Sequence, residues 1–218
     1  MPPPEYVYPR DYLDNNRIVL TDLSRRLPPS VQLDAFDSSL AAFPPKQFLP
    51  RNIGLHQWDM KTDIPKELEG VYDIVHVRNV VSVLSDEEVE DILKPGGYIQ
   101  WGEINEECST SALEELVRIT RSALPRLVPH WVPVLPQLFE STGLVDVKKD
   151  TREGLGYMDY MLHECVLMAH DIIVRNTNNK EVGQRLQGIL SEVLKETYDG
   201  AFHVWTKLTV VGRKPEYV

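Results

Sequence analysis

The chain has 218 residues, of which 42% are hydrophobic and 26% are charged, and its formal net charge is −10 at pH 7. This length suits one full α/β domain and leaves little room for a second independent domain. Because phosphate binding needs a basic face, the acidic balance and the lack of a Lys/Arg run argue against nucleic acid as a partner.

Targeting signals and cysteine motifs are not recognisable in the sequence. The N-terminus, MPPPEYVYPRDY, lacks the basic start and apolar stretch of a secretory signal. No apolar run reaches the roughly 18 residues that a membrane-spanning helix needs. Cys108 and Cys165 are far apart and form no metal or redox motif. We therefore expect free thiols, a cytoplasmic protein with a nuclear location as the alternative, and no membrane partner.

The first part of the chain predicts an arm, a helix and three strands. Residues 1–16 are rich in Pro and Tyr without a usable period, which predicts an N-terminal arm. The spacing of Leu20, Leu23 and Leu27 predicts a helix over 17–27, which a proline pair ends. Short apolar runs predict strands over 31–36, 53–58 and 73–77.

The stretch 72–103 has the pattern of a βαβ unit. The strand over 73–77 is followed by an amphipathic helix, by a tight turn at Lys94–Tyr98 (KPGGY) and by an apolar strand over 98–101. Paired glycines allow the chain to reverse where side chains would clash. Parallel strands need both faces of their sheet covered, so we expect the other elements to form layers on this sheet.

The rest of the chain predicts four helices and two strands. The helix over 157–174 is mostly apolar, which predicts a helix buried between the sheet and another copy of the chain or a lid. The strand over 144–149 is expected at an edge of the sheet, and the last strand is expected to pair antiparallel at its end. The predicted helices cover 111–124, a segment through Phe139 that Gly143 ends, 157–174 and 182–197, and the predicted strands cover 144–149 and 202–213.

Polar residues follow the predicted strands. Asp37 and Asp59 come after the first two, and Arg78 and Asn79 come after the third. In an open parallel sheet, ligands bind beyond the carboxyl ends of the strands, and an acid there can accept both ribose hydroxyls of a nucleoside. The alternative is an aspartate that caps a turn or a helix.

The histidines predict no metal site. His76 lies within a strand, where a hydrogen-bonded core histidine is the expected role. His163 and His170 lie on one predicted helix, two turns apart, too far to share a metal without other donors. The Met and Tyr side chains of 157–168 are expected in the core, with the wall of an apolar pocket as the alternative.

Several segments resemble fungal S-adenosylmethionine-dependent methyltransferases of secondary metabolism, a group that includes a methyltransferase-like global regulator. The segments are YVYPRDYLDNNR, VQLDAFD, FPPKQFLPRNIGLHQWDM, YDIVHVRNVV, LKPGGYIQWGEIN, LPRLVPHWVPVLPQLFESTGLVDV, HECVLMAH and LTVVGRKP. The resemblance implies a Rossmann-like class I methyltransferase sheet with helices on both faces, in a single domain over 17–218. It also implies S-adenosylmethionine as the cofactor and a small molecule as the substrate.

The resemblance also implies roles for residues at the strand ends. Asp37 matches the acid that holds the cofactor ribose, Asp59 and Met60 match residues that contact the adenine, and the segment 77–79 matches the lining near the methionine end. No catalytic base is implied, because methyl transfer depends largely on positioning. The implied cofactor-binding residues are Asp37, Asp59, Met60, Val77, Arg78 and Asn79.

One motif of the family is missing. Its first strand and glycine-rich loop should fall between Arg17 and Leu23, where the sequence is RIVLTDL, and no glycine precedes Gly54. Since that loop lets backbone N–H groups approach the cofactor, we expect cofactor binding to be weakened or lost. We also expect a sheet that lacks most or all of the usual first central strand. Such a sheet must close up, recruit residues 17–20 as a stub strand, or rely on a homodimer or protein partner.

Three interpretations follow. The first is a methyltransferase that acts on a small molecule in fungal secondary metabolism. The second is a catalytically degenerate methyltransferase fold with a regulatory or partner-binding role. Because the connection between Asn79 and Lys94 is also shorter than in the family, the third is a sequence that represents an incomplete gene product.

Overall fold

The computed structural model describes residues 19–78, 80, 93–107, 110–123, 131–154 and 156–216. The described residues up to Ile64 form one compact unit, and those from Pro65 onward form a second. Each unit contains its own sheet. The predicted N-terminal arm and the predicted helix after Asn79 lie outside the described residues, and the single domain over 17–218 stays a prediction.

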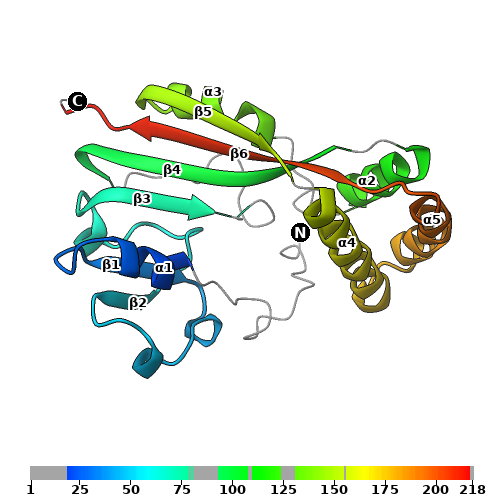
Figure 1. Cartoon of the computed structure of the whole chain (residues 1–218), viewed down its shortest axis with the longest axis horizontal. Helices are drawn as coiled ribbons and strands as arrows, with labels where there is room; N and C mark the ends of the chain where they lie inside the picture. Colours follow the sequence, from blue (N-terminus) through cyan, green and yellow to red (C-terminus); the bar gives the residue numbers. More distant parts are fainter. Residues whose placement is uncertain are drawn as a thin grey trace. The chain divides into compact units, whose positions relative to one another are not determined.

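The N-terminal unit contains one helix and a two-stranded parallel sheet (Figure 1). The sheet is held by a regular ladder in which Ala35 pairs with Leu55, and the short apolar side chains of Ala35 and Ile53 are buried. The predicted helix and both predicted strands are confirmed within a few residues. The elements are α1 (Val19–Arg26), β1 (Leu33–Asp37), β2 (Ile53–Gln57) and the 3₁₀ turns η1 (Leu40–Ala42) and η2 (Lys46–Phe48).

The C-terminal unit contains a four-stranded sheet in the order β3-β4-β6-β5 (Figure 1). β3 and β4 are parallel, and β6 is antiparallel to both β4 and β5. This mixed arrangement confirms the predicted α/β fold, the edge strand predicted over 144–149 and the antiparallel last strand. The elements are η3 (Lys66–Leu68), β3 (Tyr72–Arg78), β4 (Leu93–Glu107), α2 (Ser111–Ala123), η4 (Val132–Val134), α3 (Leu135–Ser141), β5 (Val145–Glu153), α4 (Gly156–Asn176), α5 (Lys180–Tyr198) and β6 (Val204–Arg213).

Among the described residues, β1 and β3 are both edge strands of their sheets. β1 pairs with β2, and β3 pairs with β4, and within the described ranges no other strand pairs with β1 or β3. Val19 and Leu20 lie in α1. The alternative that residues 17–20 form a stub strand is therefore wrong for these two residues.

The KPGGY segment is not the tight turn that we predicted. It belongs to the start of β4, where the pairing with β3 is interrupted: Tyr72 pairs with Leu93, and Ile74 already pairs with Tyr98. The extra residues of β4 bulge out of the ladder, and Gly96 adopts a φ of 77°, which suits glycine. Gly96 N–H donates to the Lys214 carbonyl at 3.1 Å, which joins the bulge to the residue after β6.

One face of the four-stranded sheet carries an aromatic core. Trp101 of β4 packs edge-on against Trp131 with ring centroids 5.3 Å apart, and against Phe139 of α3 at 6.3 Å. These three rings are buried, and their apolar area stabilises the contact between α3 and the sheet. The opposite face exposes Ile74 and Tyr98, with 65% and 47% of their surfaces accessible.

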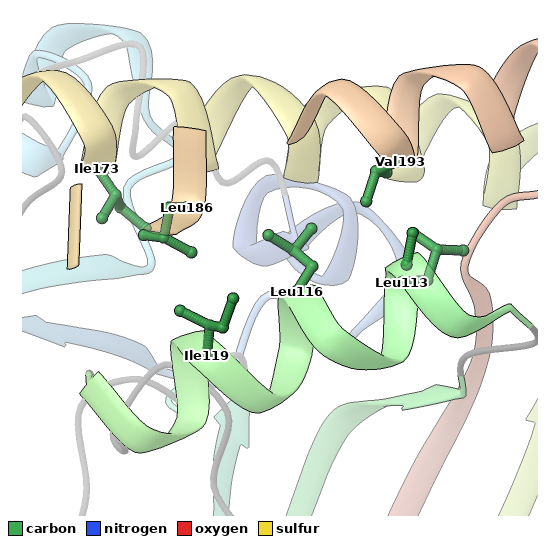
Figure 2. Close-up of a cluster of buried hydrophobic side chains, with 7 residues drawn as sticks. Leu113, Leu116, Ile119, Ile173, Leu186 and Val193 are labelled. Carbon is green, nitrogen blue, oxygen red and sulfur yellow. The ribbon is translucent and has the colours of Figure 1, made fainter. Parts of the chain in front are cut away.

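Three helices form a second core at one end of this sheet. α2 follows β4, α4 follows β5 and α5 precedes β6, so all three attach at the end toward which β3 and β4 run (Figure 1). Figure 2 shows the side chains of α2 directed at those of α4 and α5. The labelled residues are Leu113, Leu116, Ile119, Ile173, Leu186 and Val193.

The helix α4 is buried on one face, and burial of its other face against another copy of the chain or a lid stays a prediction. His163 and Ile173 are buried, whereas Tyr157, Met161 and Met168 expose 68%, 62% and 59% of their surfaces. Hydrophobicity alone does not distinguish the buried face from the exposed one, because the apolar residues of α4 lie on all sides of the helix. Within the described part of the chain, no helix is long and apolar enough to cross a membrane.

Candidate functional site

The N-terminal unit brings two predicted acids to one edge of its sheet. Asp37 ends β1, and Asp59 follows β2, whose next residue, Trp58, donates its backbone N–H to the Asp37 carbonyl at 2.9 Å. Since β1 and β2 are parallel, both carboxyl ends lie at this edge. Met60 is partly buried in the turn that follows.

Each acid uses one carboxylate oxygen in a local turn. Asp37 Oδ1 accepts from the backbone N–H of Ser39 at 3.1 Å, and Asp59 Oδ1 accepts from that of Lys61 at 3.0 Å. The turn-forming role is therefore present at both positions. No hydrogen bond from any described residue reaches Oδ2 of either acid, so each retains an oxygen that can accept from a ligand.

An aromatic group at the same edge was missed by the sequence analysis. Phe36 stacks on His56 with ring centroids 5.0 Å apart and meets Trp58 edge-on at 6.0 Å. Phe36 lies near the end of β1 and directly precedes Asp37, and Trp58 follows β2 and directly precedes Asp59. The sequence offered a signal for this group, because each of the two predicted strands ends in an aromatic residue.

The C-terminal unit brings Val77 and Arg78 to the carboxyl edge of its parallel pair. Val77 pairs with Trp101 and Arg78 pairs with Gly102, where β3 ends and β4 continues. Val77 is partly buried on the same face as Trp101, and Arg78 is exposed. Asn79 lies outside the described residues. The cofactor-binding role of these positions stays a prediction.

The sequence analysis also missed Glu103, because we predicted that its strand ended at Trp101. The strand continues to Glu107, and Glu103 is 1% exposed. Its Oε1 accepts from Trp101 Nε1 at 2.9 Å and from the backbone N–H of Val80 at 2.9 Å. An acid two residues beyond an apolar strand residue, on the same face, was the signal for this site.

His76 is exposed on the open face, and not in the core as predicted. Its Nδ1–H donates to Gln100 Oε1 across the β3–β4 pair at 3.1 Å. The sheet nevertheless removes water from part of the ring, and this desolvation lowers the pKa of His76 below its ordinary 6.5; the bond to Gln100 opposes the shift, and the charges of Arg78 and Lys207 add to it.

The lowered pKa predicts a pH dependence of stability. Below pH 6.5 the unfolded chain takes up the His76 proton before the folded chain does, so the free energy of unfolding decreases as the pH falls from 6.5 to the lower folded pKa. We expect His76→Gln to flatten this part of the profile in urea titrations at several pH values. A variant profile with the same slope as the parent would contradict the prediction.

Two buried histidines join α4, α5 and the start of β6. His163 Nε2 lies 2.9 Å from Thr197 Oγ1, and His163 Nδ1 lies 2.8 Å from His203 Nδ1. Because the Thr197 hydroxyl donates to the Val193 carbonyl at 2.8 Å, its oxygen accepts from His163 Nε2–H. His163 Nδ1 then accepts from His203 Nδ1–H, and this chain of hydrogen bonds sets the tautomer of both rings.

The second histidine of α4 has a separate partner. His170 Nε2 lies 2.9 Å from the hydroxyl of Thr120 in α2. The two histidines therefore hold α4 to different elements, as their two-turn separation requires. Within the described ranges, no group of three or more His, Cys, Asp or Glu side chains is arranged to hold a metal ion.

Solved structures share this arrangement of strands and helices. A protein from Galdieria sulphuraria described as a sarcosine dimethylglycine methyltransferase has a TM-score of 0.53 at 14% identity, over 89% of this chain and 73% of that chain. Phosphoethanolamine N-methyltransferase 2 from Haemonchus contortus, in complex with S-adenosyl-L-methionine, has a TM-score of 0.51 at 15% identity, over 89% of this chain and 45% of that chain. The chain has the methyltransferase fold.

The sequence of the chain is similar to those of fungal methyltransferases. The chain is 40% identical over 83 residues to methyltransferase grgD from a Penicillium species, and 33% identical over 88 residues to N-methyltransferase verN from Clonostachys rogersoniana. It is 29% identical over 153 residues to N-methyltransferase tcpN from Claviceps purpurea. The predicted resemblance to fungal methyltransferases is confirmed.

The matched segments are partial. They cover 35%, 37% and 63% of this chain and 28%, 31% and 54% of the three relatives, so the chain spans less than two thirds of each relative's length. No protein-family profile matches the chain.

Proposed function

We propose that this chain binds S-adenosylmethionine and functions in the transfer of its methyl group to a small molecule. The observation that carries the proposal is the placement of Asp37 and Asp59 together at the carboxyl edge of a parallel strand pair. In doubly wound sheets, this edge is where nucleoside ligands bind. The methyltransferase fold and the similarity to fungal methyltransferases support the choice of cofactor and substrate class.

The proposal gives each predicted residue a binding role. The second oxygen of Asp37 accepts a ribose hydroxyl, while Asp59 and Met60 contact the adenine. Val77, Arg78 and Asn79 line the methionine end. When bound, the cofactor supplies an electrophilic methyl group on a sulfonium, and the chain's contribution is to hold and orient the reactants.

The geometry fits the ribose and adenine better than it fits the rest of the cofactor. Asp37 and Asp59 each keep one carboxylate oxygen for a ligand. Val19–Leu23, where a glycine-rich loop would be expected, instead lies in α1. We therefore propose weak cofactor binding, with a dissociation constant between about 0.1 and 1 mM, equivalent to about 4–5.5 kcal/mol. A cytoplasmic location and a homodimer or protein partner stay predictions from the sequence.

Isothermal titration with S-adenosylmethionine and S-adenosylhomocysteine tests the proposal. We expect saturable binding by the parent protein and an affinity about tenfold lower for Asp37→Ala, since a hydrogen bond to a charged group contributes about 1.5–3 kcal/mol. Asp63→Ala, which changes an exposed acid after β2, is the control and should bind like the parent. Absence of binding by the folded parent at millimolar cofactor would overturn the proposal.

A further inference from the structure

We propose that Glu103 is a positioning residue that fixes the end of β3 and, through it, the segment 77–78. The assignment rests on the proposed function in one respect: that segment is taken to contact the cofactor. The geometry of Glu103 itself lies entirely within the C-terminal unit.

The hydrogen-bond acceptor changes at the end of the β3–β4 ladder. Backbone pairing of β3 with β4 stops at Arg78 and Gly102. Two residues later, the backbone N–H of Val80 donates to the side chain of Glu103 at 2.9 Å. The carboxylate therefore extends the pairing of β3 beyond the last backbone rung, at the point where the cofactor-binding residues lie.

The carboxylate of Glu103 is itself held rigidly. Trp101 Nε1 donates to the same Oε1 at 2.9 Å, and the Trp101 ring is packed against Trp131 and Phe139. Two N–H groups that converge on one carboxylate oxygen restrict the rotamers of Glu103. Because the site is buried, water competes poorly for these hydrogen bonds, which are stronger than in solvent. The aromatic core thus holds the carboxylate, and the carboxylate holds the Val80 amide.

The consequence is specific to the exit of β3. A strand end that lacks a backbone partner is free to fray, and its side chains then sample several orientations. When the Val80 amide is bound to Glu103, the end of β3 keeps a single conformation. Loss of the carboxylate should therefore weaken cofactor binding beyond any effect on global stability, because the bound conformation is then only one of several.

Three variants separate this role from a general loss of stability. Glu103→Ala removes the acceptor, and Glu103→Gln keeps an oxygen that can accept from both N–H groups. Leu186→Ala truncates a fully buried residue of the three-helix core in the same unit, away from the pairing of β3 with β4. Thermal unfolding of each variant measures the stability change, and binding is measured well below its melting temperature.

Binding of S-adenosylhomocysteine gives the first readout. We expect the dissociation constant to rise about tenfold for Glu103→Ala, to stay within about threefold of the parent for Glu103→Gln, and to be unchanged for Leu186→Ala, a tenfold change being 1.4 kcal/mol. Equal losses for Glu103→Ala and Leu186→Ala would overturn the positioning role.

Amide hydrogen exchange gives a second readout that needs no cofactor. We expect the Val80 amide to exchange at least tenfold faster in Glu103→Ala than in the parent, with protection largely restored in Glu103→Gln. Unchanged exchange at Val80 in Glu103→Ala would overturn the inference. If the parent binds no cofactor but its Val80 amide is protected by Glu103, the proposed function fails and the positioning of the strand end stands.

Discussion

Leu186→Ala should lower the free energy of unfolding by about 3 kcal/mol, within the range of about 2–5 kcal/mol measured for buried leucines. Leu186 is 0% exposed and lies in the core that α5 forms with α2 and α4. The substitution removes apolar contacts and leaves a cavity between three helices whose backbones are held by other side chains. Urea unfolding followed by circular dichroism measures the change.

A second leucine of the same helix is the matched control. Leu194 is 47% exposed, so Leu194→Ala has the same helix propensity change but removes little buried area. We expect a loss of no more than about 0.5 kcal/mol. Similar losses at Leu186 and Leu194 would mean that the three-helix core does not form as described.

His163→Ala should destabilise the chain by about 3 kcal/mol, because it removes two buried hydrogen bonds and leaves their partners unsatisfied. The lost partners are Thr197 in α5 and His203 before β6. The effect should appear as a lower melting temperature and as faster proteolysis of the α4–α5 segment, since the same side chain joins three elements.

Thr197→Val separates the two hydrogen bonds. It keeps the volume and branching of the side chain and removes the hydroxyl that accepts from His163 and donates to the Val193 carbonyl. Because the His163–His203 hydrogen bond remains, we expect a smaller loss, of about 1–2 kcal/mol. In the double variant, the two losses should be less than additive because they share one interaction. Full additivity would show that the two side chains contribute independently.

Local patterns in the sequence were sufficient for most elements. The apolar runs of β1, β2 and β3 and the amphipathic period of α2 and α5 report backbone geometry directly, because side-chain direction repeats every two residues in a strand and about every 3.6 in a helix. Asp37 and Asp59 could be placed at strand ends for the same reason. Their common edge follows from the parallel pairing of β1 with β2.

Features that depend on distant neighbours could not be predicted in this way. The exposure of His76 and of one face of α4 reflects which side chains the rest of the chain brings against them. Glu103 was missed because the predicted strand ended at Trp101, and because its distant partner, Val80, becomes a neighbour only when β4 extends past the end of β3. The bulge at Gly96 depends in turn on Lys214, more than a hundred residues away.

The connection between β5 and β6 has a consequence for the order of folding. These strands are antiparallel neighbours, yet roughly 50 residues lie between Glu153 and Val204, and closing a loop of that length costs about 2 kcal/mol more in chain entropy than closing a short hairpin. The helices α4 and α5 form from local contacts and shorten this distance before the strands meet. We therefore expect α4 and α5 to pack together before β5 pairs with β6, and this packing to accelerate the pairing.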